Sequence, residues 1–140
     1  MILDCRIILS HYLTKYPDDA KANLQCAVLI SIVWNAHTAT AAIEQPITKF
    51  FVNSALADSL KTLVKKHRDV LSTKYDIDKV LKNSNTLRDF DSNFTAPQFS
   101  YKNVKEYYDA VTVSTRVDKF PIPVFGLSAA DDPMQPGGSM

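Results

Sequence analysis

Glycine is the residue that this sequence most lacks. Only three glycines occur in 140 residues, at positions 126, 137 and 138, against an average usage of about 7%. A loop that cradles a phosphate needs several glycines in one turn, because only glycine lets successive backbone N–H groups approach the phosphate closely. The three that are present spell neither a P-loop nor a dinucleotide fingerprint. The sequence therefore argues against a nucleotide-binding fold.

Excess charge and long apolar runs are also missing. Sixteen basic and fifteen acidic residues give a formal net charge of +1, which provides no long-range field for nucleic acid or an anionic membrane surface. No apolar run reaches the ~18 residues that crossing a bilayer requires, and the opening MILDCRIILSHYL lacks the features of a signal peptide. We expect no nucleic-acid partner and a soluble chain as given. The compartment stays undetermined.

Cysteine and histidine are scarce. Cys5 and Cys26 are too few for a disulfide scaffold, and each stands beside apolar residues, so we expect two reduced thiols in the core. The three histidines, His11, His37 and His67, show no metal-ligand spacing with each other or with the cysteines. We therefore expect neither a bound metal nor another cofactor.

What remains is an ordinary globular composition, with 46% hydrophobic and 22% charged residues. The stretch LQCAVLISIVW at 24–34 is apolar throughout, which is typical of a strand buried on both faces in a parallel sheet covered by helices. The fold class expected is α/β. Apolar spacing predicts helices over 1–16, 47–72 and 78–82 and from 103 onward, a second strand over 122–127, and a loop over 83–100.

Residues 89–100 partly match a calcium-binding loop. Asp89, Asp91 and Asn93 occupy the first three ligand positions. The turn glycine is replaced by Phe94 and the closing glutamate by Ser100, so the loop lacks both its bend and its bidentate ligand. We expect no calcium site.

The run from Gly126 to Ala130 nearly spells the GxSxG nucleophile elbow, with Ser128 at its centre. An elbow serine must stand between a strand and a helix. A strand is predicted before Ser128, but the following ADDPMQPGG contains two prolines and two glycines, which break a helix. We therefore do not expect Ser128 to be a nucleophile.

Asp131 and Asp132 follow the second predicted strand directly. Open α/β sheets place ligands and catalytic groups at the carboxyl ends of their strands. Aspartate and proline are also common in any turn. Spacing alone leaves these two interpretations equally supported.

Several short blocks occur in a characteristic order. They are FDSNFTAP at 90–97, FSYK at 99–102, EYY at 106–108, IPV at 122–124 and ADDP at 130–133. In this order the chain resembles the α/β-hydrolase subfamily of abhydrolase-domain proteins one and three, which are related to medium-chain ester hydrolases. The opening MILDCRIILSHYL is similar to the helix that follows the family's GxSxGG elbow, and LQCAVLISIVW to the next strand. The resemblance covers essentially the whole chain, although Ser100 stands where the family usually has glycine.

The resemblance implies a serine hydrolase of carboxylic acyl esters, of the carboxylesterase, acylglycerol lipase or phospholipase type, with lipid or small ester substrates. The family triad runs Ser, Asp, His along the chain. Asp132, spaced from Pro136 as in such acid turns, carries over as the acid, with Asp131 as the alternative. Neither the nucleophilic serine nor the triad histidine carries over to a residue of this chain.

The fold implied is an incomplete α/β hydrolase, the C-terminal part of a parallel sheet with covering helices and a helical cap. Its expected parts are the helix and strand after the elbow (1–36), the cap region (37–97), and a helix, strand and acid turn (98–140). Phe and Leu residues of the cap, among them Phe50 and Phe51 on the apolar stripe of the helix predicted over 47–72, suit either an acyl chain or core packing. The resemblance leaves open an N-terminal membrane anchor in a parent protein, and the oligomeric state is undetermined.

Two functional hypotheses follow. In the first, a parent protein cleaves acyl esters, and this chain is an inactive fragment or truncated product that contains the cap and the triad acid. In the second, the chain is a catalytically dead remnant that binds lipid or a partner through an open apolar sheet edge.

Overall fold

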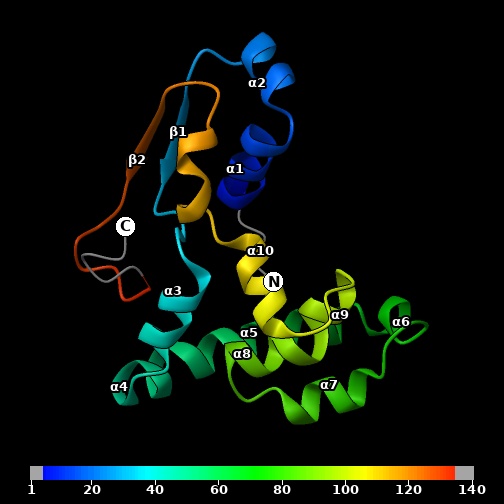
Figure 1. Cartoon of the computed structure of the whole chain (residues 1–140). Helices are drawn as coiled ribbons and strands as arrows, with labels where there is room; N and C mark the ends of the chain where they lie inside the picture. Colours follow the sequence, from blue (N-terminus) through cyan, green and yellow to red (C-terminus); the bar gives the residue numbers. More distant parts are fainter. Residues whose placement is uncertain (1–4, 135–140) are drawn as a thin grey trace. The chain divides into compact units, whose positions relative to one another are not determined.

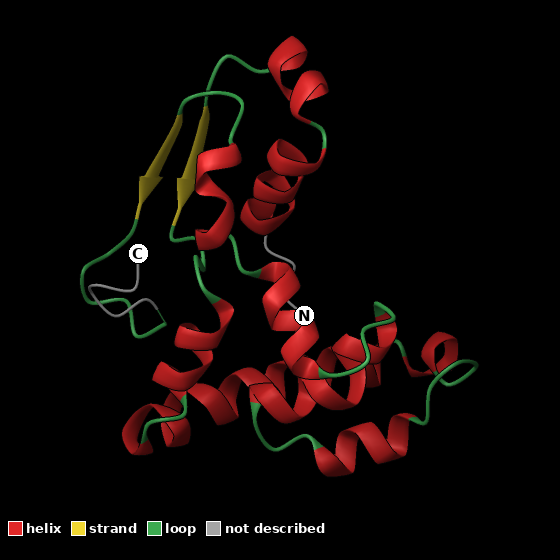
Figure 2. Cartoon of the chain, viewed as in Figure 1, coloured by secondary structure: helices red, strands yellow, loops and turns green. Residues whose placement is uncertain are grey.

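The computed structural model describes residues 5–134, and the chain divides into two compact units. Unit 1 is Thr40–Ala110, and unit 2 combines the chain before residue 40 with the chain after residue 110. The chain passes between the units inside helix α3 (Ala36–Ile43) and again inside α10 (Val104–Val111). Every element lying wholly within unit 1 is helical, and both strands belong to unit 2 (Figure 2).

Unit 2 is built on a two-stranded parallel sheet. Strand β1 (Ala27–Ile30) pairs with β2 (Val124–Leu127) over their whole length, with Ala27 opposite Val124 and Ile30 opposite Leu127. Parallel strands cannot be joined by a tight turn and need a crossover connection. Here that connection contains all of unit 1. The expected parallel pairing is confirmed, in a sheet of two strands.

One face of this sheet is covered by α1 (Cys5–Lys15) and by the 3₁₀ helix η3 (Ser114–Lys119), while α2 (Pro17–Asn23) leads into β1 (Figure 1). Leu13 of α1 and Leu29 of β1 are fully buried between the helices and the sheet. The buried apolar residues of the two clusters on this face are Leu13, Ala20, Ala27, Leu29, Ile32, Trp34 and Val113.

The expectation that the first strand is buried on both faces is wrong. β1 alternates, with Ala27 and Leu29 buried and Val28 and Ile30 more than half exposed. In β2, Phe125 is likewise 62% exposed. A four-residue strand presents alternate side chains to opposite faces, and only one face carries a helical layer among the described residues. A continuous apolar sequence does not distinguish these two situations.

Both cysteines are exposed, which corrects their expected place in the core. Cys5 begins α1, and Cys26 immediately precedes β1, where its side chain lies outside the buried face. Neither forms a disulfide within residues 5–134. In the same range, no helix combines the length and the apolar character that crossing a membrane requires.

Unit 1 has an apolar core of its own, formed by Leu60, Val64, Ile77, Val80, Phe90 and Phe94. Its remaining elements are α4 (Pro46–Thr48), η1 (Lys49–Asn53), α5 (Ser54–Lys66), α6 (Arg68–Leu71), α7 (Ile77–Asn83), α8 (Leu87–Phe90), η2 (Asp91–Thr95) and α9 (Ala96–Gln98). η1 and η2 are π-helical, with the widened i→i+5 turn that is rare in proteins.

The single helix predicted over 47–72 is interrupted by η1 and by a break at His67. The wider π turn changes which side chains face inward. Phe50 and Phe51, expected on the buried stripe, are 73% and 69% exposed, whereas Asn53 is fully buried. The side-chain Oδ1 atom of Asn53 accepts a hydrogen bond from the backbone N–H of Leu87 at 2.7 Å, which satisfies one donor at the start of α8.

The loop predicted over 83–100 is wrong as well. Thr86 and Asp89 form a reciprocal capping box that starts α8, and Pro97 stands in the first turn of α9. The helix predicted from residue 103 is confirmed: the Asn103 side chain accepts from the backbone N–H of Glu106 at 2.9 Å, next to the first turn of α10.

Gly126 is required by the packing of unit 2. A Cβ atom at this position would lie 2.7 Å from Cζ2 of the Trp34 indole, a side chain that is 8% exposed. This close approach explains the glycine in the GLSAA run without a nucleophile elbow.

We expect Gly126→Ala to lower the free energy of unfolding by about 1–3 kcal/mol, because the buried indole must move to admit a methyl group. Chemical denaturation monitored by far-ultraviolet circular dichroism, a signal that does not depend on the single tryptophan, measures this. Adding Trp34→Phe to the variant should make the Ala substitution less costly than it is in the wild-type background. An unchanged cost in that double variant would contradict the proposed clash.

Candidate functional site

The candidate acid turn directly follows β2. The backbone N–H of Asp132 donates to the Ala129 carbonyl at 3.3 Å, and the Asp132 Oδ1 atom accepts from the backbone N–H of Met134 at 2.8 Å. An aspartate that accepts from the residue two positions later forms an Asx turn around the intervening Pro133. The turn therefore fixes the direction of the Asp132 carboxylate.

The two neighbouring carboxylates differ in their surroundings. Asp132 is half-buried, whereas Asp131 is exposed. Oδ2 of Asp132 accepts no hydrogen bond from residues 5–134, so one oxygen of an oriented carboxylate remains for a further donor. Orientation and partial burial both favour Asp132 over Asp131 as a functional acid. Pro136, whose spacing from Asp132 favours Asp132 as the acid in the sequence, lies outside the described residues.

The end of β1 lies at the same edge of the sheet as the acid turn, since the strands are parallel. The backbone N–H of Ser31 donates to the Leu127 carbonyl at 2.6 Å, and Ser31 has a positive φ of 53°. Arg6, from α1, donates to the carbonyls of Ile30 and Ser31, the latter at 2.6 Å. The Arg6 guanidinium therefore lies at this edge of the sheet. Nothing in the sequence pattern of α1 distinguishes Arg6, so this residue was not predicted.

Ser128 is half-buried and follows the last residue of β2, but no helix begins within residues 128–134. Residues 130–134 instead form the turns that carry Asp132. Ser128 is therefore not presented at the start of a helix, where backbone N–H groups would stabilise an oxyanion.

The histidines lie on separate elements. His11 is on α1, His37 is in the first turn of α3, and His67 is in unit 1, between α5 and α6. Burial lowers the pKa of His11, and the positive charges of Arg116 and Lys15 lower it further. Its Nε2 atom is buried and has no hydrogen-bond partner in the described part of the chain.

The three residues that partly matched a calcium loop point to different partners. Asp89 belongs to the cap of α8, and the Asn93 side-chain amide donates to the carbonyl of Asn83 at 3.1 Å. Asp91 is buried and accepts from the hydroxyl of Tyr108 at 3.0 Å. Residues 5–134 contain no cluster of three or more His, Cys, Asp or Glu side chains that could hold a metal.

Asp91, which is buried, belongs to a polar cluster that joins two of the sequence blocks, FDSNFTAP and EYY. Arg88 lies over the Tyr108 ring, with 5.7 Å between the guanidinium carbon and the ring centroid. The same guanidinium binds both carboxylate oxygens of Glu44, at 2.6 and 2.9 Å. Within unit 1 this cluster therefore ties α8 and η2 to α10 and to the end of α3. The interaction holds these segments together.

Comparison with known proteins identified several relatives. The chain is 33% identical over 130 residues to the Phospholipase ABHD3 of Mus musculus, covering 93% of this chain and 31% of that protein. It is 32% identical over 135 residues to the Monoacylglycerol lipase of Saccharomyces cerevisiae, covering 93% of this chain and 30% of the relative. An Abhydrolase domain-containing protein of Dictyostelium discoideum is 30% identical over 90 residues, covering 64% of this chain and 22% of the relative.

The chain thus spans about a third of the length of the curated relatives that match most of it. No protein-family model matches the chain, and no solved structure gives a significant match.

We expect no adduct when the purified 140-residue chain is treated with a fluorophosphonate probe and examined by intact mass, because no helix begins after Ser128 within residues 129–134. Ser128→Ala is the matched control. An adduct on the wild-type chain that disappears in this variant would show that Ser128 is a nucleophile.

The buried Asp91 predicts a pH dependence of stability. Burial raises the pKa of Asp91 above its usual value, although the Tyr108 hydrogen bond opposes this. The folded state therefore binds this proton more tightly than the unfolded chain does. Lowering the pH from about 7 toward about 4 should increase the contribution of Asp91 to the free energy of unfolding, and raising it should reduce that contribution.

Asp91→Asn should remove the contribution of this residue to the pH dependence of the free energy of unfolding. Asparagine keeps an oxygen that can accept from Tyr108 but has no charge to desolvate. At neutral pH the variant should be as stable as the wild type or more stable by about 1 kcal/mol. Urea unfolding across this pH range measures the effect. Asp69→Asn, at an exposed carboxylate, is the control; an equal pH slope in wild type and Asp91→Asn would contradict the assignment.

Proposed function

Because this chain belongs to the α/β-hydrolase family, in the group of abhydrolase-domain proteins, we propose that it forms part of a lipid ester hydrolase. The observation that carries the proposal is the similarity over 93% of the chain to relatives named as a phospholipase and a monoacylglycerol lipase. The proposed substrates are carboxylic esters of lipids, such as phospholipids and acylglycerols.

In this proposal Asp132 is the acid of a Ser-Asp-His triad. The acid of such a triad orients an imidazole and stabilises the imidazolium that forms when the serine proton is taken. The Asx turn supports this role, because Oδ1 is held by the N–H of Met134 and Oδ2 is left for an imidazole N–H. Asp131, exposed at the same turn, is the less suitable candidate.

We assign the remaining roles by unit. Unit 2 contributes the last part of a parallel sheet and the acid turn, as in an incomplete α/β-hydrolase fold, and unit 1 is the helical cap. The nucleophilic serine and the triad histidine are proposed to belong to segments outside these 140 residues. On this basis the chain alone is expected to be inactive as an esterase, since an acid without its histidine and serine catalyses no acyl transfer.

The alternative is a catalytically dead chain that binds lipid or a partner. The exposed apolar face formed by Val28, Ile30, Phe125 and Leu127 is the observation that could support it. The relatives favour the hydrolase.

The test is a chimera in which this chain replaces the 130 aligned residues of the mouse relative. We expect the chimera to hydrolyse a phospholipid or a monoacylglycerol, and Asp132→Asn in it to lower kcat by about 10³–10⁴-fold, because the histidine then loses its charged partner. Asp131→Asn is the matched control and should retain activity.

Two results would overturn the proposal. One is a folded chimera, reactive toward fluorophosphonate, in which Asp132→Asn retains full activity. The other is a folded chimera that binds lipid vesicles and shows neither hydrolysis nor labelling, which would favour the non-catalytic alternative.

A further inference from the structure

Ser31, the residue that follows β1, has a backbone conformation that serine rarely adopts. Its φ of 53° lies in the left-handed region, where a Cβ atom crowds the neighbouring carbonyl oxygen. The other non-glycine residue with a positive φ in residues 5–134 is Ser100, which follows the end of helix α9, where left-handed residues are common. Ser31 follows the end of a strand instead. A strained residue persists only where its surroundings hold it, and such residues cluster at functional sites.

Arg6 holds Ser31 from one side. The Nη1 atom of this arginine donates to the carbonyl of Ile30 at 2.5 Å and to the carbonyl of Ser31 at 2.6 Å. The φ rotation of Ser31 lies between these two carbonyl groups, so its positive value turns both of them toward one guanidinium. Hydrogen bonds from a charged donor are stronger than those from a neutral donor. The two bonds therefore compensate for the unfavourable conformation of Ser31.

The guanidinium is held in place by the helix that carries it. Arg6 is half-buried near the start of α1, and Leu13, two turns further along the same helix, is fully buried. Leu13 belongs to one apolar cluster with Ala27, the first residue of β1. Helix α1 and strand β1 are therefore packed together at one end of the strand and joined by Arg6 at the other.

The other side of Ser31 leads to the acid turn. Its backbone N–H donates to the carbonyl of Leu127 at 2.6 Å, which adds one hydrogen bond to the end of the parallel ladder. Leu127 is the last residue of β2, and the turn that carries Asp132 starts at Ala129, two residues later. The direction in which the chain enters this turn therefore depends on where Ser31 is held.

We propose that Arg6 is a positioning residue for the Asp132 carboxylate. It holds Ser31, which in turn holds the carbonyl of Leu127 at the entrance to the acid turn. All of these residues belong to unit 2. The inference rests on the proposed function in that a carboxylate of fixed direction is what a triad acid needs. Loss of Arg6 should make the Asx turn less ordered and, in a working hydrolase, lower kcat without changing KM.

The first test uses the whole 140-residue chain and the amide NMR signal of Met134. Because Oδ1 of Asp132 accepts from this N–H at 2.8 Å, the Met134 signal should move as Asp132 takes up a proton. We expect Arg6→Met to reduce this movement roughly twofold or more, since the Asx turn is then populated for less of the time. Asp132→Asn should remove most of the movement, which assigns it to this carboxylate.

Arg116→Met is the matched control. Arg116 also donates to a backbone carbonyl within unit 2, that of Thr112 at 2.6 Å, and this carbonyl lies outside the series of contacts that leads to the acid turn. The Met134 signal should therefore titrate in this variant as it does in wild type. An equal loss of movement in Arg6→Met and Arg116→Met would contradict a specific role of Arg6.

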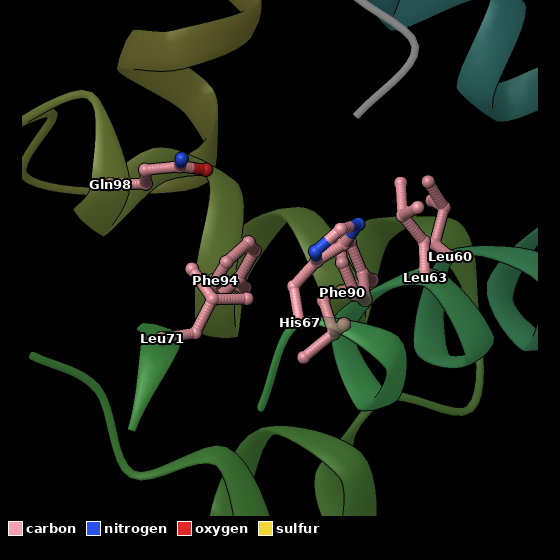
Figure 3. A pocket seen from close by; sticks show the side chains of 8 residues that line it. Leu60, Leu63, His67, Leu71, Phe90, Phe94 and Gln98 are labelled. Atoms are coloured by element: carbon pink, nitrogen blue, oxygen red, sulfur yellow. The ribbon is translucent and has the colours of Figure 1, made fainter. Parts of the chain in front are cut away.

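Signals from both units show whether a variant is folded. The methyl signals of Leu13 and Leu29 report on the buried face of the sheet in unit 2. The amide signals of Phe90 and Phe94, whose side chains line a pocket in unit 1, serve as the unchanged reference (Figure 3). A folded Arg6→Met variant with the wild-type titration of Met134 would overturn the proposal. Arg6→Gln, which keeps a polar side chain of shorter reach, gives the same decision if Arg6→Met does not fold.

The part played by Ser31 is tested with Ser31→Gly. Glycine adopts a positive φ without steric cost, so it depends less on the two hydrogen bonds from Arg6. Arg6→Met should therefore reduce the Met134 movement less in the Ser31→Gly background than in the wild-type background. An equal reduction in both backgrounds would show that Arg6 does not act through Ser31, and would overturn the proposal.

Catalysis is measured in the chimera proposed above. Arg6→Met should lower kcat roughly tenfold with KM unchanged, and Arg6→Lys, which keeps a charged donor, should restore part of the loss. Arg116→Met should retain kcat. An active chimera that depends on Asp132 but keeps its kcat in a folded Arg6→Met variant would overturn this inference alone. A folded but inactive chimera would overturn the proposed function alone, since the Met134 titration still decides whether Arg6 orders the turn.

Discussion

Parallel strands cannot be joined by a tight turn, so the pairing of β1 with β2 obliges the chain to leave the sheet after Ile30 and to return to it before Val124. The residues between them build a second compact unit with its own apolar core. The same pairing places the ends of both strands at one edge, where Ser31 donates to Leu127 and where the acid turn of Asp132 begins. The candidate acid therefore owes its position to this register.

The second unit depends on buried polar groups as well as on its apolar core. Asn53 is brought inward by a π-helical turn and supports the start of α8, and Asp91 is held by Tyr108. Leaving either of these two side-chain oxygens without a donor in the interior would be costly. The block FDSNFTAP contains Asp91 and the block EYY contains Tyr108. The hydrogen bond between these two side chains gives both blocks a role in holding unit 1 together, beyond their likeness to the family. Neither block forms a calcium site.

The two units have different roles in the function proposed for this chain. Unit 2 offers a carboxylate whose direction is set by its own backbone turn, as a triad acid needs. Unit 1, proposed as the helical cap, has an apolar core of its own.

Local spacing and ordered motif blocks were enough to predict the α/β class, the parallel pairing, the helix that starts near Asn103 and the resemblance to the abhydrolase proteins. It did not reveal that β1 is covered on one face, since Val28 and Leu29 are equally apolar. Nor did it reveal which apolar residues of unit 1 face inward, because a π turn at η1 shifts the register and exposes Phe50 and Phe51. Burial depends on what packs against a residue from distant parts of the chain, and only the tertiary structure decides that.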